Sequence, residues 1–451
     1  MSKTKENKSY SLMDKLNSLC KRRGIIFQSS EIYDGINGCW DFGPLGVELR
    51  KNIKDLWWKR IVRQREDVVG LDCSIIMNSM VWKASGHVDS FTDPLVDCKK
   101  CNHRFREDLL EEKVCPDCGG ELTEPRNFNL MFQTYMGAVE SDANKIYLRP
   151  ETAQGIYINF KNVLNSSRLR IPFGIAQIGK AFRNEINPRN FIFRSREFEQ
   201  MELQYFIHPN DADKYFDYWV EDADSWFKSI GLKKENLRVR AHEDNELAHY
   251  ARKCVDFEYN FPFGWQELAG IHDRTDFDLK RHIETSGKDL YYFDDITKEK
   301  FIPNVIETSE GIDRTLLTIL VDAYEEEEEN TKTSKQGDMR VVLKFHKTIA
   351  PVKAGIFPLS KKPALIEVCK KLEADLSKEF AVKYDQTGSI GRRYRRQDEI
   401  GTPYCITVDF ETIDPESEGF ESATIRIRDT MKQERINLAQ IKLWIRDELD
   451  S

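Results

Sequence analysis

The sequence has no long apolar run and no strong excess of one charge. No stretch reaches the roughly 20 apolar residues that cross a bilayer, and residues 1–10 are polar rather than signal-like. We therefore expect a cytoplasmic protein without membrane contact. The formal net charge of -8 argues against binding nucleic acid through bulk positive charge. We expect no DNA partner, and any contact with RNA must be local.

Paired cysteines are also few, which argues against a disulfide-rich secreted domain. Most of the 10 cysteines stand alone and are expected to be buried thiols. Two Cys-x-x-Cys pairs are formed by Cys98, Cys101, Cys115 and Cys118. This spacing is typical of a tetrahedral zinc site, and it predicts a structural Zn²⁺ in a small insertion over residues 90–125. Reduced thiols without metal are the weaker alternative, and His103 is expected at the surface rather than as a fifth ligand.

The length of 451 residues exceeds what one hydrophobic core usually organises, so we expect at least two domains. Hydrophobic residues form 40% and charged residues 32% of the chain, a balance that fits a globular enzyme. We predict a flexible N-terminus (1–10), a first domain (11–330), a linker (331–338) and a second domain (339–451). A helix opening at Gly311 is expected to end in the acidic residues 325–329, and strands alternate with helices from residue 339.

A polar strand face marks the candidate site. Residues 175–185 and 195–207 read as two strands of a hairpin, joined by the loop 186–194. Because side chains alternate between the faces of a strand, one polar face carries Gln177, Arg183, Glu185, Phe198, Gln200, Glu202 and Gln204. A buried strand face should be apolar, so this exception to the pattern indicates a functional site.

Activation of a carboxylate by ATP needs cations along the triphosphate, an aromatic partner for adenine, and acids that hold magnesium. The hairpin supplies these groups in residues 182–185 (Phe-Arg-Asn-Glu) and 193–198 (Phe-Arg-Ser-Arg-Glu-Phe). Residues 307–314 add Glu307 and Arg314 at a strand-to-helix turn, where Gly311 permits close approach of the backbone. Taken singly, these residues fit a surface ion pair, a core ring or a helix cap such as Ser309. Their combination favours an ATP site.

The same residues resemble the class II aminoacyl-tRNA synthetases. Residues 45–77 are similar to the family's first motif, a helix and strand that form the dimer interface. Residues 182–198 are similar to the second motif, and residues 311–314 match the third, glycine-x-x-arginine. Three further strings, residues 40–46, 149–155 and 391–403, narrow the resemblance to the homodimeric glycyl-tRNA synthetases.

The resemblance implies an α+β fold: an antiparallel catalytic sheet flanked by helices, a small zinc-ribbon-like insertion, and a C-terminal α/β anticodon-binding domain. It implies a glycine–tRNA ligase that uses ATP and Mg²⁺ to form glycyl-adenylate and then charges tRNA-Gly, working as a homodimer. A synthetase for another amino acid and a non-catalytic RNA-binding relative are the alternatives. The second is disfavoured because Arg183, Glu185, Phe198 and Arg314 are all present.

The resemblance also implies roles for individual residues. Catalysis falls to Arg183, Glu185 and Arg314, with Phe198 and Arg314 on opposite faces of adenine. The ATP-binding set is Arg183, Asn184, Glu185, Phe193, Arg194, Ser195, Arg196, Glu197, Phe198, Glu267, Leu268, Gly311, Ile312, Asp313 and Arg314. The glycine-binding set is Arg106, Glu151, Phe198, Glu199, Gln200, Met201, Glu202, Arg274, Glu307, Ser309 and Gly311. The tRNA-binding set is Arg392, Arg393, Tyr394, Arg395 and Arg396, for which a solvated basic turn is the plainer reading.

Overall fold

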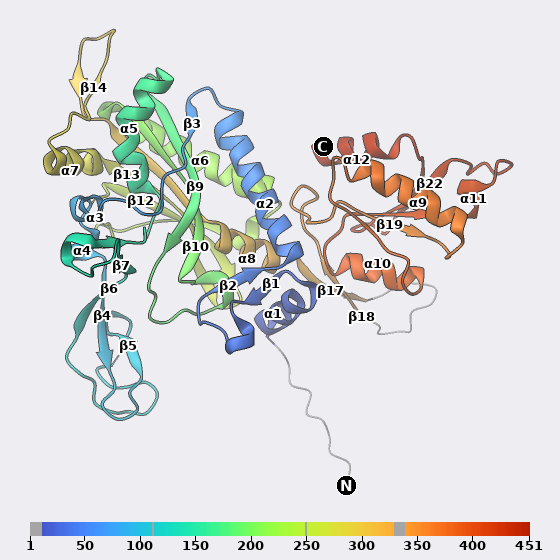
Figure 1. Ribbon diagram of the computed structural model, residues 1–451, viewed down its shortest axis with the longest axis horizontal. Coiled ribbons are helices and arrows are strands. Elements are labelled where there is room, and N and C mark those ends of the chain that lie inside the picture. The colour runs from blue at the N-terminus through green and yellow to red at the C-terminus, as the bar shows by residue number, and fades with distance from the viewer. Residues whose placement is uncertain (1–10, 111, 249, 329–338) are drawn as a thin grey trace.

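A computed structural model describes residues 11–110, 112–248, 250–328 and 339–451 (Figure 1). The predicted flexible N-terminus and the predicted linker 331–338 lie outside these residues. Within the described ranges, no helix has the length and apolar content that crossing a bilayer requires.

The largest element is a seven-stranded sheet that crosses the main body of the molecule. In spatial order its strands are β11 (Leu237–Ala241), β12 (Lys253–Phe261), β13 (Gly264–Thr275), β16 (Asn304–Gly311), β10 (Glu197–Ile207), β9 (Phe173–Phe182) and β3 (Val68–Gly70). Only β3 and β9 pair in parallel, and the other neighbours are antiparallel. The predicted antiparallel sheet with flanking helices is therefore confirmed.

Helices pack on both faces of this sheet because successive side chains of each strand point to opposite faces, and apolar ones occur on both. Met201, Leu203 and Tyr205 of β10 enter one apolar core, together with residues of α2 (Pro44–Trp58), α6 (Ala212–Ser229) and α8 (Ile312–Ala323). On the opposite face, Phe206 joins a smaller core with α5 (Ala153–Ser167) and α7 (Phe277–Ser286). The stretch of this second face that holds Gln200, Glu202 and Gln204 stays polar although these side chains are buried.

The remaining elements of the main body are short, apart from one N-terminal helix. They are α1 (Leu12–Arg23), β1 (Ile26–Gln28), β2 (Trp40–Phe42), α3 (Ser79–Ala84), α4 (His87–Ser90), β7 (Gln133–Tyr135), β8 (Lys145–Tyr147), β14 (Tyr292–Phe293) and β15 (Lys300–Phe301). A three-stranded sheet, ordered β5 (Arg104–Arg106), β4 (Thr92–Asp97) and β6 (Arg126–Asn129), extends away from the main body and carries the four grouped cysteines near its tip (Figure 1).

The strand expected within residues 45–77 is short in the structure, where β3 ends at Gly70. Beyond it, side chains bind the backbone in place of a neighbouring strand. Gln177 Oε1 accepts from the Cys73 amide at 2.6 Å, and Arg149 Nη1 donates to the Cys73 carbonyl at 2.8 Å. The Gln177 side chain on β9 therefore takes the place of a backbone hydrogen bond between strands at this point.

The prediction that the helix opening at Gly311 ends in the acidic residues 325–329 is wrong for those of them that the structure describes. The helix α8 ends at Ala323, and β17 (Tyr324–Glu328) pairs antiparallel with β18 (Met339–Leu343). Lys344 Nζ lies 2.7 Å from a Glu325 oxygen, and Arg340 Nη2 lies 2.5 Å from Glu327. Basic residues on and just after the partner strand offset the repulsion among the glutamates and favour an extended pair.

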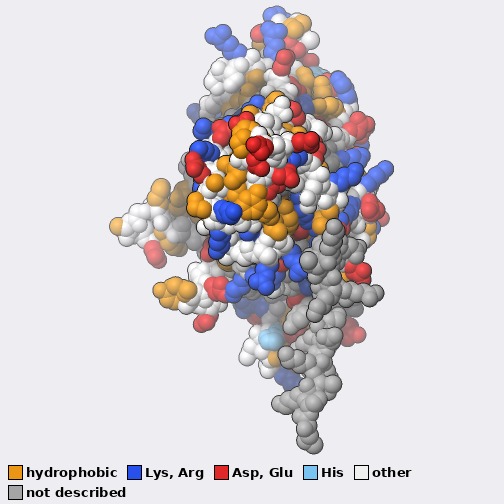
Figure 2. All heavy atoms as spheres, turned by 90° about the vertical axis from the view of Figure 1, so that its right-hand side faces the viewer, with side chains coloured by type: hydrophobic (Ala, Val, Ile, Leu, Met, Phe, Trp, Pro, Cys, Tyr) orange, Lys and Arg blue, Asp and Glu red, His pale blue; other side chains and the backbone are white. Residues whose placement is uncertain are grey.

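The C-terminal part is built on a five-stranded sheet ordered β20 (Val382–Tyr384), β19 (Ala354–Pro358), β21 (Tyr404–Val408), β22 (Ser422–Ile427) and β23 (Gln433–Asn437). Its helices are α9 (Pro363–Leu376), α10 (Ile390–Asp398), α11 (Phe410–Ile413) and α12 (Ile441–Asp450). Figure 2 views this part from its outer side, where apolar side chains gather among acidic and basic ones. Exposed apolar residues of this part include Leu359, Phe410, Phe420 and Leu443.

Candidate active site

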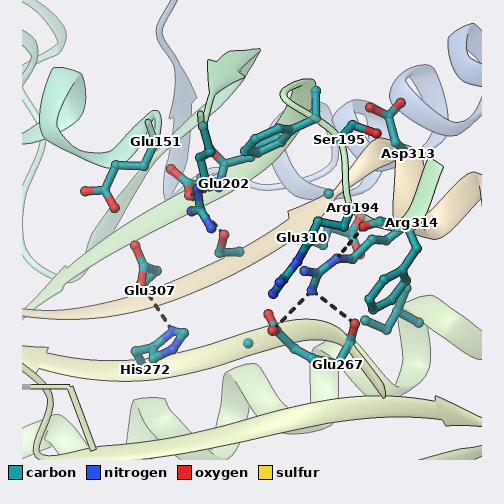
Figure 3. Close-up of a pocket in the computed structure, with 18 of the residues that line it drawn as sticks. Glu151, Arg194, Ser195, Glu202, Glu267, His272, Glu307, Glu310, Asp313 and Arg314 are labelled. Atoms are coloured by element: carbon teal, nitrogen blue, oxygen red, sulfur yellow. Dashed lines mark hydrogen bonds and ion pairs between the residues drawn. The ribbon is translucent and has the colours of Figure 1, made fainter. Parts of the chain in front are cut away.

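One cavity of about 230 Å³ opens on the polar face of the seven-stranded sheet (Figure 3). It lies where the predicted hairpin, the residues preceding α8, and β13 converge. The predicted residues that line it are Glu151, Arg183, Glu185, Phe193, Arg194, Ser195, Phe198, Gln200, Glu202, Glu267, Leu268, Arg274, Glu307, Ser309, Gly311, Asp313 and Arg314. The structure therefore brings most of the two predicted substrate sets to a single place.

Three carboxylates gather at one end of the cavity: Glu151, Glu202 and Glu307 (Figure 3). Arg274 Nη1 donates to both oxygens of Glu307, at 3.1 and 3.2 Å. Glu202 Oε1 accepts from Ser309 Oγ and from Gln200 Nε2, each at 2.9 Å, while its other oxygen accepts from Thr152 Oγ1. This acidic end is preorganised to hold a cation.

Burial and charge give these acids different protonation states. Burial, followed by the neighbouring charges of Glu307 and Glu151, raises the pKa of Glu202 to about 8. Burial also opposes ionisation of Glu307, but the Arg274 guanidinium and His272 together outweigh it and lower the pKa of that carboxyl. At neutral pH, Glu202 is therefore mostly protonated unless a cation enters the cavity.

Arginines mark the other end. The Arg314 guanidinium lies 4.6 Å from the centre of the Phe193 ring and 3.1 Å from a Glu267 carboxylate oxygen. The Arg183 guanidinium lies 5.4 Å from the Phe198 ring, and burial lowers the pKa of Arg194 from its usual range. Cations beside aromatic rings suit a nucleotide with its phosphates.

Several predicted residues do not line the cavity: Asn184, Arg196, Glu197, Ile312, Glu199, Met201 and Arg106. Alternation along β10 explains two of them, because Glu199 and Met201 face away from Phe198, Gln200 and Glu202. Met201 is core, and Glu199 pairs with Arg50 at 2.7 Å. Contiguous motif residues cannot all point into one cavity.

The other predicted residues outside the cavity have partners elsewhere. Ile312 is buried in the hydrophobic core, and Glu197 pairs with Lys180. The backbone N–H of Asn184 donates to the Leu130 carbonyl at 2.7 Å. Arg196 Nε donates to the Glu185 carbonyl at 3.0 Å. These contacts support the loop between β9 and β10.

Arg106 stands in a neighbouring cavity of about 190 Å³ between the insertion and the loop after β9. Its Nη1 lies 3.2 Å from Asp93, and Glu185 and Arg194 line both cavities. The insertion therefore borders the candidate site without entering its main cavity.

Five lining residues are absent from the predicted sets: Ile192, Tyr250, Gly270, His272 and Glu310. Gly270 and His272 precede Arg274 by four and two positions on β13, so period-two alternation could have found them. Although burial opposes it, contacts with Cys254 and Glu307 raise the pKa of His272 to about 10. Tyr250 lies in a loop before β12, where no periodicity points to it.

The four grouped cysteines come together as predicted, and their thiols are free of disulfides. Their Sγ atoms all lie within 4.8 Å of one another, with 3.5 Å between Cys98 and Cys118 and 3.6 Å between Cys101 and Cys115. Four thiolates around zinc at bonds of about 2.3 Å lie roughly 3.8 Å apart. The cluster thus fits a tetrahedral metal ion.

The C-terminal arginines lie on the helix α10 rather than on a turn. Arg393 is buried, and its Nη1 donates to the Pro358 carbonyl at 2.6 Å. Arg396 Nε donates to Asp385 at 3.0 Å, and the Tyr394 hydroxyl lies 2.7 Å from Thr407 Oγ1. Only Arg392 and Arg395 of this set have mainly exposed side chains.

Comparisons with known proteins agree with this geometry. Residues 137–324 match the family "tRNA synthetase class II core domain (G, H, P, S and T)", and residues 353–448 match the family "Anticodon binding domain". The chain is 52% identical over 443 residues to a protein of Treponema denticola named glycine–tRNA ligase, covering 97% of each chain. Proteins of the same name from Caldanaerobacter subterraneus subsp. tengcongensis and Clostridium acetobutylicum are 52% and 50% identical, covering 97% of this chain and 98% of theirs. The chain therefore belongs to the glycine–tRNA ligase family of class II aminoacyl-tRNA synthetases.

Proposed function

We propose that this protein activates glycine with ATP and transfers the glycyl group to the 3′ end of tRNA-Gly in the cytoplasm. The observation that carries the proposal is the division of one cavity into an acidic end and an arginine-rich end. Glycine brings an ammonium group and a carboxylate, and ATP brings phosphates, so the two ends match the two substrates in charge.

At the acidic end, Glu151, Glu202 and Ser309 hold the glycine ammonium. The ammonium stabilises the ionised form of Glu202, whose proton is lost as glycine binds. Close side chains beside the α-carbon exclude larger amino acids by clash, and no proteinogenic amino acid is smaller than glycine. An editing site is therefore unnecessary.

At the arginine-rich end, Arg183 orients the glycine carboxylate toward the α-phosphate, and Arg194 and Arg314 offset phosphate charge. A carboxylate oxygen attacks the α-phosphorus, and pyrophosphate leaves. The terminal ribose hydroxyl of tRNA then attacks the acyl carbon and releases AMP. Orientation and charge stabilisation provide the catalysis, and no enzyme side chain forms a covalent intermediate.

Two metals accompany this proposal. Magnesium bound with ATP would offset phosphate charge. The side chains of Glu185 and Glu267 fit it because they are oxygen donors that line the arginine-rich end. Zinc at Cys98, Cys101, Cys115 and Cys118 stabilises the insertion and takes no part in the chemistry.

We also propose a homodimer. Ile76 forms a β-bridge with Leu148, which follows the β7–β8 hairpin, and Ile76, Met136 and Val139 are exposed apolar residues. Exposed apolar groups of this kind are typical of interaction surfaces. Light scattering on the purified protein should give twice the chain mass, and a monomer at micromolar concentration would contradict the proposal.

The decisive experiment is exchange of labelled pyrophosphate into ATP with each of the twenty amino acids. Glycine alone should support exchange. Exchange with a different amino acid would favour the alternative class II specificity, and no exchange with any would favour the non-catalytic relative. Charging of tRNA-Gly transcripts then tests the second step.

A further inference from the structure

We infer that His87 is a positioning residue for the glycine-binding end of the cavity, where it holds the carboxylate of Glu151. This inference rests on the proposed function and adds a residue that does not itself line the cavity. His87 begins α4, the short helix that precedes the cysteine-bearing insertion.

Each ring nitrogen of His87 has a partner that holds the side chain in place. Its Nε2 lies 3.4 Å from Glu151 Oε2, and its Nδ1 lies 2.8 Å from Ser85 Oγ. The ring also packs against Trp82 and Phe91, with ring centres 5.5 Å apart in both pairs. The side chains of His87 and Glu151 are only 13% and 15% exposed, so water competes weakly for this contact.

Ser85 keeps the Nε2 proton facing Glu151. Its hydroxyl carries one proton, which can point to the Trp82 carbonyl at 3.3 Å or to His87 Nδ1. When the ring is charged, Nδ1 donates to the hydroxyl. When the ring is neutral, the hydroxyl turns and donates to Nδ1. The Nε2–H donor therefore serves Glu151 in both states of the ring.

Glu151 needs this support because it stands among other acids. Gln154 Nε2 donates to its Oε1 at 3.1 Å, which leaves Oε2 to His87. Glu202 and Glu307 line the same cavity from the sheet, and the Arg274 guanidinium on β13 favours the ionised form of Glu151. Without His87, burial would favour protonation of Glu151, and repulsion from Glu307 would turn its carboxylate away from the ammonium position.

The backbone of this turn has its own anchor, so the side chain can be changed separately. Asn129 Nδ2 donates to the carbonyls of His87 and Val88 at 3.0 and 2.9 Å. Phe91, just after the same turn, lies 5.5 Å from the Arg183 guanidinium at the nucleotide end. Displacement of the whole turn would therefore disturb ATP binding, whereas loss of the His87 contact alone would not.

The test compares His87→Met, which keeps bulk but has no N–H donor, with His87→Gln, which restores a donor near Nε2. In pyrophosphate exchange, His87→Met should raise the KM for glycine about tenfold, the effect expected when a buried carboxylate loses a close N–H partner. Its KM for ATP should stay within about twofold, as expected for an interaction on the amino-acid side only. His87→Gln should recover most of the glycine affinity. His103→Met, on the exposed surface of the insertion that follows α4, is the matched control.

An unchanged glycine KM in His87→Met would overturn the inference. Equal rises in both KM values, or no recovery in His87→Gln, would also overturn it, because either result indicates a general packing role. If the unaltered protein shows no glycine-dependent exchange, the proposed function fails and this inference fails with it. Normal exchange in the unaltered protein with an unaffected His87→Met variant removes the inference alone.

Discussion

Arg314 lies between the apolar and the charged features of the nucleotide end. Its guanidinium is near the Phe193 ring, the Glu267 backbone carbonyl and the Glu267 carboxylate. A guanidinium already fixed in this way can stabilise phosphate charge without reorganisation during the reaction. The same reasoning makes its removal more damaging to chemistry than to folding.

We predict that Arg314→Ala lowers pyrophosphate exchange by about 100-fold or more, the range seen when one preorganised charge-stabilising group is lost. Binding of tRNA-Gly, measured by filter retention, should change little. Arg446→Ala, which removes an exposed arginine from α12, serves as the control. An Arg314→Ala variant with a normal exchange rate would refute the assignment.

Glu202 gives the candidate site a pH dependence. Its pKa of about 8 means that it is protonated and uncharged below that pH, and ionised above it. Because the ionised form attracts the glycine ammonium, the KM for glycine should fall as pH rises from about 6.5 to 8.5 around that pKa. Glu202→Gln should raise the KM and remove this slope, whereas Glu367→Gln, at an exposed position of α9, should retain it. A slope that survives in Glu202→Gln would assign the titration to another group.

At the scale of elements, β10 shows how far sequence reasoning reaches. Its alternation predicts the buried polar face of Gln200, Glu202 and Gln204, and the structure has that face. Contacts between residues that are far apart in the sequence are harder to predict. His87 lies near Glu151 in a fold where α4 packs against α3 and β6, an arrangement that no local pattern encodes.

Arg274 links two strands and a helix, namely β13, β16 and α7. From β13 it donates to Asp278 of α7 at 2.8 Å and to Glu307 of β16 at 3.1 Å, and all three side chains are buried. Removing one partner leaves buried charge uncompensated, which costs about 3–5 kcal/mol. We expect Arg274→Met to lower the free energy of unfolding by that amount in urea titrations at neutral pH.

The loss should shrink as pH falls, because Glu307, whose pKa Arg274 helps to lower, then takes up a proton and no longer needs a cation. Arg446→Met removes an exposed ion pair with Glu379 and should cost about 0–1 kcal/mol. Similar losses for Arg274→Met and Arg446→Met would show that the buried network contributes no more than a surface pair.

The insertion depends on its cysteine cluster because none of its described residues from 98 to 125 belongs to a hydrophobic core. The amides of Lys100 and Cys101 each lie 3.4 Å from Cys98 Sγ, an arrangement that stabilises a thiolate. We predict about one zinc per chain by metal analysis, the stoichiometry of a four-thiolate site, and its loss in Cys115→Ser. Cys39→Ser, which changes a lone cysteine, should keep the metal. Protein purified in reductant without zinc would contradict the assignment.

At the scale of the whole molecule, the two sheets divide the proposed work. The seven-stranded sheet carries the cavity and the C-terminal sheet carries α10, so the proposed sites of amino-acid activation and of tRNA recognition lie on separate sheets. Sequence reasoning located the basic patch but could not sort its members. Burial decides this: Arg393 supports the Pro358 carbonyl from inside, while Arg392 and Arg395 face outward.

This division leads to a prediction that separates the two steps. Changing both Arg392 and Arg395 to Ala should raise the KM for tRNA-Gly about 30-fold, since each of the two phosphate or base contacts contributes roughly 1 kcal/mol. Pyrophosphate exchange should stay unchanged, because no residue of α10 lines the cavity. A matched double variant, Lys371→Ala with Arg446→Ala, removes the same charge from α9 and α12. Equal effects of the two double variants on charging would indicate bulk attraction, and loss of exchange in the α10 variant would place its effect in folding rather than in tRNA recognition.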